Sequence, residues 1–186
     1  MNSTSPNFFI DTHFHVFAAG IGVPEARYTP TYTASLADWR GAASLASHAI
    51  AKGVVVQTSF LGFDNTQMLT ELAAHPETLR GVAVLPSTTD AATIAALHHQ
   101  GVRGIRLNLA GRSHDASDWS KPNTHELWEA IDAWGWHLEL HTDQDALPAV
   151  LAQLPAHVPL VIDHMGKPER ASKQDATVRA LVQRAK

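Results

Sequence analysis

The stretch FFIDTHFHVF, residues 8–17, combines strand-forming aromatic and β-branched residues with three polar side chains. Successive side chains in a strand point to opposite faces of the sheet. Asp11, His13 and His15 are therefore predicted to share one face, and the apolar residues between them the other. Two imidazoles on one inward face can bind a metal ion, or a substrate carboxylate when they are protonated. Because H-x-H is a short pattern that also arises by chance, the rest of the chain decides its meaning.

A strand-like run followed by a helix-like run occurs six times along the chain. The strand-like runs cover residues 8–17, 53–60, 81–86, 102–110, 136–142 and 159–165. Strands joined by helical crossovers form a parallel sheet with right-handed connections. No G-x-G-x-x-G turn follows the first run, and polar residues at several strand ends favour a barrel over an open sheet. We predict one domain over residues 1–186 with an incomplete TIM-barrel-like α/β fold, comprising about six of eight βα units.

Histidines gather at the C-terminal ends of the predicted strands, where barrel enzymes place their active sites. The chain contains 12 histidines, and four of them end three strands: His13, His15, His141 and His164. Chance would scatter these residues over the chain. The pattern therefore indicates a functional site rather than ordinary polar strand ends.

Charged residues follow the same alternation. Arg106 and Asn108 share the predicted inward face of the fourth strand, and Glu139 lies on that of the fifth. An inward arginine needs a carboxylate from the protein or the substrate, because an unpaired buried guanidinium is very costly. In the sixth strand the alternation predicts that Asp163 points away from His164, toward the helical layer.

Composition excludes several classes of protein. The hydrophobic fraction of 45% and charged fraction of 17% are those of a globular domain, and the net charge of -4 predicts no nucleic-acid partner. The chain has no cysteine and no apolar run of membrane-spanning length, so we expect no thiolate metal site and no membrane partner. The start MNSTSPN lacks the features of a signal peptide, which predicts a cytoplasmic protein.

Five stretches resemble the amidohydrolase superfamily, and within it the branch of 2-pyrone-4,6-dicarboxylate lactonase and related sugar-lactone hydrolases. They are DTHFHVF, RYTP, VVVQTSFLGFDN, GVRGIRLNL and VIDHMGKP, which together cover most of residues 8–168. The resemblance implies a TIM-barrel, metal-dependent-hydrolase fold. It also implies catalytic roles at the lactone carbonyl for His13, His15 and His164. The substrate-binding residues that it implies are Tyr28, Ser59, Arg106, Asn108, Arg112, His141 and Lys167.

The resemblance leaves the cofactor open. No lysine ends the fourth strand, so we do not expect a binuclear centre on a carbamylated lysine. Either no cofactor is required, or one divalent metal such as zinc is bound by His13, His15 and His164. The superfamily's water-activating aspartate, at the end of an eighth strand, is not among the 186 residues. We therefore expect this chain alone to hydrolyse a lactone poorly or not at all, with Asp115 as the replacement candidate.

The leading hypothesis is an amidohydrolase-type hydrolase that acts on a carboxylated lactone, of the 2-pyrone-4,6-dicarboxylate or sugar-lactone type. One alternative is a metal-dependent decarboxylase of the same superfamily, and another is a non-catalytic fragment. The expected partner is the small-molecule lactone. Two open sheet edges also allow a homo-oligomer, because unpaired strand edges tend to associate.

Overall fold

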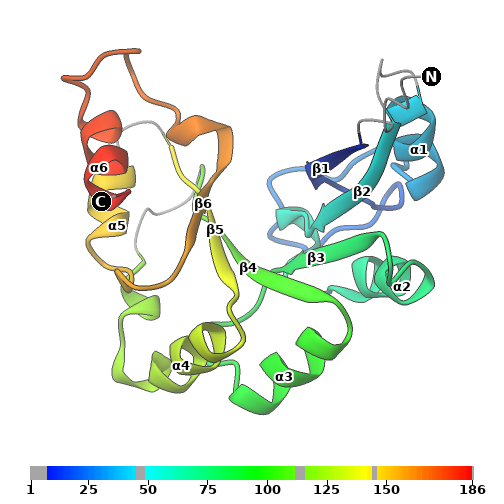
Figure 1. The fold of residues 1–186 in the computed structure, drawn as a ribbon, viewed down its shortest axis with the longest axis horizontal. Coiled ribbons are helices and arrows are strands. Elements are labelled where there is room, and N and C mark those ends of the chain that lie inside the picture. The colour runs from blue at the N-terminus through cyan, green and yellow to red at the C-terminus, as the bar shows by residue number, and fades with distance from the viewer. Residues whose placement is uncertain (1–7, 45–48, 112–115, 144–145, 186) are drawn as a thin grey trace, which may run out of the picture. The chain divides into compact units, whose positions relative to one another are not determined.

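The computed structural model describes residues 8–44, 49–111, 116–143 and 146–185 (Figure 1). The strands are β1 (Phe8–Phe14), β2 (Ala49–Val56), β3 (Leu79–Ala83), β4 (Val102–Asn108), β5 (His137–His141) and β6 (Leu160–Ile162). The α-helices are α1 (Leu36–Ser44), α2 (Thr66–Ala74), α3 (Ala91–His99), α4 (His125–Ala133), α5 (Leu147–Leu151) and α6 (Ala176–Arg184). Short 3₁₀ helices are η1 (Ser59–Leu61), η2 (Ser117–Trp119), η3 (Pro122–Thr124) and η4 (Asp163–Gly166).

The strands follow the order of the chain in one six-stranded sheet, from β1 to β6. This order confirms the predicted incomplete TIM-barrel-like α/β fold with six βα units. The chain divides into two compact units, residues 1–84 with 99–102 and residues 85–98 with 103–186. The assignment of residues 1–186 to one domain stays a prediction.

In the first unit, β1 pairs with β2 and β2 with β3, all in parallel. Gly53 lies inside β2, where an added Cβ would lie 2.6 Å from the Phe14 ring and 2.9 Å from the Trp39 indole. The missing side chain lets Phe14 stack on Trp39 of α1 with ring centroids 4.3 Å apart. Glycine is therefore required here for close packing of the helix on the sheet.

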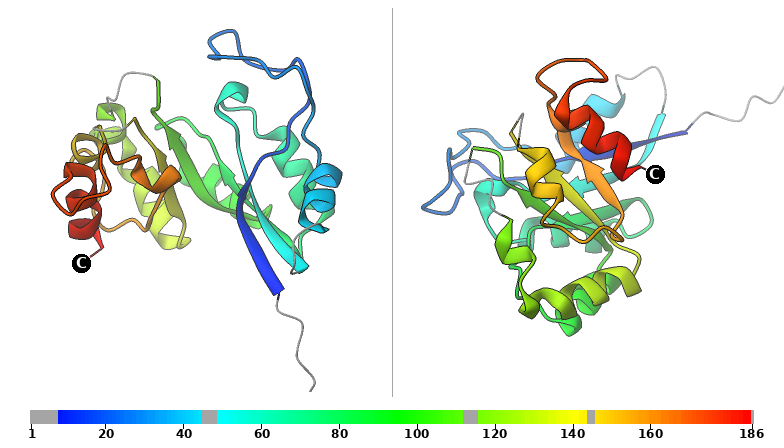
Figure 2. Two further views of the ribbon diagram at one scale, coloured as in Figure 1. Left: turned by 90° about the horizontal axis from the view of Figure 1, so that it is seen from above. Right: turned by 90° about the vertical axis from the view of Figure 1, so that its left-hand side faces the viewer.

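In the second unit, β4, β5 and β6 also pair in parallel. The register places Arg106 opposite Glu139, and Asn108 opposite His141. Apolar residues of these strands are fully buried, including Ile105 and Leu140. Helices α5 and α6 lie side by side in this unit (Figure 2).

Local capping explains where several helices begin. The Asp38 N–H donates to Ser35 Oγ at 3.1 Å, and the Ser35 N–H donates to Asp38 Oδ2 at 2.8 Å, which is a reciprocal capping box before α1. Asp90 accepts from the Thr93 N–H at 2.7 Å before α3.

No helix in the described part of the chain is long and apolar enough to cross a membrane.

Candidate active site

His13 and His15 of the first unit face each other at the end of β1. His15 Nδ1 lies 2.7 Å from the Val56 carbonyl oxygen. A carbonyl only accepts, so His15 donates through Nδ1 and keeps the lone pair of Nε2. That Nε2 lies 3.4 Å from His13 Nε2. Two nitrogens bound to one tetrahedral zinc ion at 2.0–2.1 Å would also be about 3.4 Å apart, so the pair fits two ligands of one ion.

The predicted grouping of Asp11 with these histidines is wrong. Asp11 Oδ2 accepts from the Trp39 indole N–H at 2.8 Å, and Trp39 is on α1, the helix on which Phe14 also packs. The register of β1 on β2 shifts between Asp11 and Phe14. This irregularity interrupts the simple alternation of faces, which a reading of the sequence takes to be unbroken.

Two predicted substrate-binding residues lie in loops of the first unit. Tyr28 is in the loop between β1 and α1, is 58% exposed, and has its ring centroid 5.4 Å from that of Phe60. Ser59 is half-buried and begins η1, three residues after β2 ends. The substrate-binding roles of both residues stay predictions.

A buried ion-pair cluster lies at the centre of the second unit. Arg106 Nη2 donates to Asp163 Oδ2 at 2.6 Å, and Arg106 Nε lies 3.0 Å from Glu139 Oε1. All three side chains are at most 5% exposed. The requirement that Arg106 meet an anion is thus fulfilled by two carboxylates of the protein. Its predicted contact with substrate stays a prediction.

The predicted orientation of Asp163 toward the helical layer is wrong. β6 ends at Ile162, and the chain turns into η4 at Asp163. The alternation of faces therefore stops one residue earlier than the sequence suggests, and the carboxylate turns to Arg106.

The environment of Glu139 disfavours its charged form. Burial, together with the negative charge of Asp163, raises the pKa of Glu139 to about 8, although Arg106 acts in the opposite direction. Two buried carboxylates sharing one guanidinium explain the direction of this shift, because the pair carries one more negative charge than the arginine can neutralise.

This shift predicts a pH-dependent stability. The folded chain binds the Glu139 proton more tightly than the unfolded chain, whose pKa is near the ordinary 4.5. The stabilisation is complete below that value and is lost as the pH rises to about 8. Urea titrations measure the free energy of unfolding at each pH. As the pH rises from about 5 to about 9, this free energy should fall less for Glu139→Gln than for the parent chain. Identical pH slopes for the two proteins would contradict the assignment, and Glu77→Gln, at an exposed position before β3, is the matched control.

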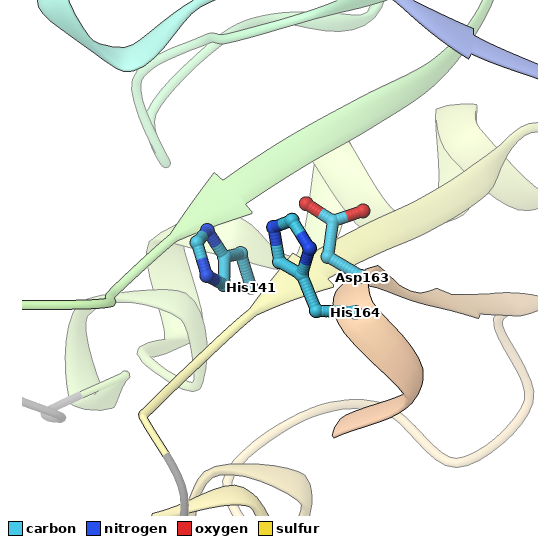
Figure 3. Close-up of side chains that lie close together, drawn as sticks. All are labelled: His141, Asp163 and His164. Atoms are coloured by element: carbon cyan, nitrogen blue, oxygen red, sulfur yellow. The ribbon is translucent and has the colours of Figure 1, made fainter. Parts of the chain in front are cut away.

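His141 and His164 form the second feature of this unit, at the ends of β5 and β6. Their ring centroids are 4.5 Å apart, and the ligand atoms of His141, Asp163 and His164 all lie within 4.8 Å of one another (Figure 3). His141 is 9% exposed, and among the described residues neither of its ring nitrogens has a hydrogen-bond partner. Two imidazoles and a carboxylate are a ligand set that suits zinc.

The electrostatics keep His141 neutral. Burial lowers the pKa of His141 to about 4, and the positive charges of Lys167, His164 and Arg106 add to the effect, whereas Asp163 opposes it. A neutral imidazole has one N–H donor and one lone pair. At neutral pH His141 can therefore donate a hydrogen bond or bind a metal without first losing a proton.

The chain around His164 has an unusual backbone. His164, Met165 and Lys167 have φ of 52°, 55° and 43°, and Gly166 between them has φ of 71°. For residues with a Cβ this left-handed conformation costs roughly 1–2 kcal/mol each. We define residues 163–167 as the left-handed turn.

Met165 offers a direct test of this strain, since its side chain is 83% exposed. Met165→Gly should raise the free energy of unfolding by about 0.5–1 kcal/mol, because relief of the left-handed penalty exceeds the entropic cost of glycine. Val182→Gly on the exposed side of α6 should instead lower it by about 0.5 kcal/mol. Thermal or urea unfolding measures both, and a destabilised Met165→Gly protein would show that the turn is unstrained.

The remaining predicted residues are placed as follows. Asn108 ends β4, is half-buried, and accepts from the Ala110 N–H at 3.2 Å. Lys167 is half-buried at the end of the left-handed turn. Arg112 and Asp115 lie outside the described residues. Whether His13 and His15 act together with the groups of the second unit stays a prediction.

Glu139 and Asp163 are the site residues that reasoning from sequence missed. For Glu139 a signal existed: in parallel strands in register, an inward carboxylate on β5 lies next to an inward arginine on β4. Asp163 gave no such signal, because its orientation depends on where β6 ends.

Comparison with known proteins agrees with this geometry. The amidohydrolase family matches residues 10–186, so the chain belongs to that family. Among its curated relatives is a 2-pyrone-4,6-dicarboxylate hydrolase from Comamonas testosteroni, 33% identical over 97% of this chain and 60% of the relative.

Two crystal structures share both fold and sequence with the chain. One, from Acinetobacter baumannii with citric acid bound, is assigned as a 2-pyrone-4,6-dicarboxylic acid hydrolase; it is 32% identical with a TM-score of 0.82, over 94% of this chain and 65% of that one. The other, from Pseudomonas putida and assigned likewise, is 38% identical with a TM-score of 0.79, over 94% and 63%. The chain thus spans less than two thirds of the length of these relatives.

Proposed function

We propose that this chain carries the substrate-binding and carbonyl-polarising groups of a hydrolase that acts on a carboxylated lactone, of the 2-pyrone-4,6-dicarboxylate or sugar-lactone type. The observation that carries the proposal is the cluster of His141, Asp163 and His164 beside the cationic Lys167. Its support from relatives is the 32–38% identity with proteins named or assigned as such hydrolases. The citric acid in the Acinetobacter structure, itself a polycarboxylate, is consistent with such a ligand.

The chemistry of the cluster suits attack on a lactone carbonyl. As water adds, negative charge develops on the carbonyl oxygen and is stabilised by fixed donors near that atom. The neutral His141 can supply one N–H, and the exposed His164 beside it can supply another. The ammonium of Lys167 would attract a ring carboxylate by a charge-assisted bond. For His13 and His15, the resemblance implies a role at the lactone carbonyl.

A divalent metal would fit this proposal without being required by it. In the second unit, His141, Asp163 and His164 would supply three ligands to such an ion. In the first unit, His13 and His15 would supply two. A bound zinc ion would polarise the carbonyl as a Lewis acid. Metal dependence is a proposal here, as are the cytoplasmic location and the lack of nucleic-acid and membrane partners.

Calorimetric titration tests the ligand class. 2-Pyrone-4,6-dicarboxylate should bind the 186-residue chain in a saturable way, whereas uncharged 2-pyrone should bind at least about tenfold more weakly, since it has no carboxylate for the charge-assisted contact with Lys167. The two ligands share the ring and differ in charge, so equal binding of both, or binding of neither, would refute the proposal.

Hydrolysis is a separate question. The expectation that this chain alone hydrolyses its substrate poorly or not at all stays a prediction. The disappearance of the pyrone ring absorbance measures it. Turnover at rates ordinary for enzymes, about 1 to 10³ per second, would contradict it.

A further inference from the structure

The left-handed turn needs an external support. Four consecutive residues, 164–167, have positive φ, and three of them are not glycine. Strained backbone of this kind persists only where the surrounding structure holds it in place. Because the turn carries both His164 and Lys167, whatever holds the turn also determines where these two side chains lie.

One support lies at the start of the turn. Asp163 is 6% exposed, and its carboxylate accepts from Arg106 on β4 at 2.6 Å. Arg106 is held in turn by Glu139 on β5, whose Oε1 lies 3.0 Å from its Nε. The hydrogen bond from Nη2 thus joins the Asp163 carboxylate to a buried guanidinium that also lies next to Glu139.

A second support lies at the other end of the turn. Gly166 is buried, and an added Cβ would lie 3.1 Å from Leu147 of α5 and 3.1 Å from Thr177 of α6. The backbone of the turn thus packs closely against these two helices. Between the two anchors, His164 and Met165 are exposed, and His164 contacts the ring of His141.

From these contacts we propose that Asp163 is a positioning residue: its ion pair with Arg106 anchors the left-handed turn and so holds His164 against His141. The catalytic meaning of that position rests on the function proposed above. Without the anchor, the turn relaxes toward ordinary backbone angles and the imidazole of His164 moves away from that of His141.

The test compares three variants by NMR and amide exchange. Asp163→Ala removes the anchor, and Asp163→Asn keeps an oxygen that can accept from Arg106. Glu139→Gln replaces the other carboxyl group on the same arginine by an amide that keeps an acceptor oxygen for Arg106, and it is the matched control. The readouts are the exchange rates of the amides of residues 164–167 and the nuclear Overhauser effect between the rings of His141 and His164, which are 4.5 Å apart in this structure.

Asp163→Ala should raise amide exchange in the turn at least about tenfold more than in β4 and β5, and it should abolish the ring-to-ring signal. Asp163→Asn should retain most of the protection, and Glu139→Gln should leave the turn protected. An unchanged turn in Asp163→Ala would overturn the proposal. Equal loosening in Glu139→Gln would also overturn it, because the anchor would then not be specific to Asp163.

Titration with 2-pyrone-4,6-dicarboxylate separates this proposal from the function. If the parent chain binds the ligand and Asp163→Ala binds it at least about tenfold more weakly, both stand. If the turn loosens as expected but the parent chain does not bind, the proposed function fails and the positioning role stands. If the ligand binds and the turn is unaffected by Asp163→Ala, the positioning role fails.

Discussion

Arg106→Met is expected to lower the free energy of unfolding by about 3–5 kcal/mol, the cost of removing one partner from a buried charge cluster. The arginine is 4% exposed and lies between Glu139 and Asp163, which are also buried. Methionine fills similar volume but leaves the buried Asp163 carboxylate beside the Glu139 carboxyl group without a counter-charge. Burying unpaired charge is far more costly than losing an exposed ion pair.

Urea unfolding measures the effect, with Arg179→Met as the control. Arg179 is exposed on α6 in the same unit, and its replacement should change stability by no more than about 0.5 kcal/mol. Adding Glu139→Gln and Asp163→Asn to Arg106→Met should restore part of the loss, because no buried charge is then left unpaired. A loss below about 1 kcal/mol for Arg106→Met would show that the carboxylates find solvent or another partner.

Lys167→Met is expected to weaken binding of 2-pyrone-4,6-dicarboxylate about ten- to a hundredfold, since a hydrogen bond to a charged group contributes roughly 1.5–3 kcal/mol. Lys167 is half-buried at the end of the left-handed turn, and its positive charge acts on His141. Methionine keeps an unbranched side chain on the same backbone, so the change removes mainly the charge.

The matched control is Lys173→Met, an exposed lysine of the same unit. It should leave the affinity within about twofold of the parent chain, because an exposed charge away from the ligand is screened by salt. Equal losses for both variants in calorimetry would indicate general attraction of an anion rather than a contact at Lys167. No loss for either would place the ligand elsewhere.

Much of the fold was predictable because regular elements leave periodic traces. The alternation of strand-like and helix-like runs predicted six βα units, and the observed strand order confirms them. The bounds were less accurate: β2 covers residues 49–56 where the sequence suggested 53–60, and Gly53 lies within it. In the sequence, this glycine suggests the end of a helix. In the structure it is required inside a strand, because Phe14 and Trp39 pack closely on the sheet there.

The site was predictable only as far as strands stay regular. His141 ends β5 as expected. The parallel register places it opposite Asn108 of β4. Asp11 and Asp163 were assigned to the wrong faces, since one lies at a register shift and the other just past the end of a strand. The positive φ of His164 and Met165 could not be predicted from the sequence, because only a few per cent of non-glycine residues adopt that conformation.

We propose above all that His141 and His164 contact the bound carboxylated lactone. The most direct measurement follows the imidazole NMR signals of both residues while 2-pyrone-4,6-dicarboxylate is added to the 186-residue chain, with 2-pyrone as the reference ligand. Both signals should move and reach saturation together with the calorimetric binding curve, and 2-pyrone should leave them nearly unchanged. Saturable binding of the dicarboxylate with both imidazole signals unmoved would contradict it.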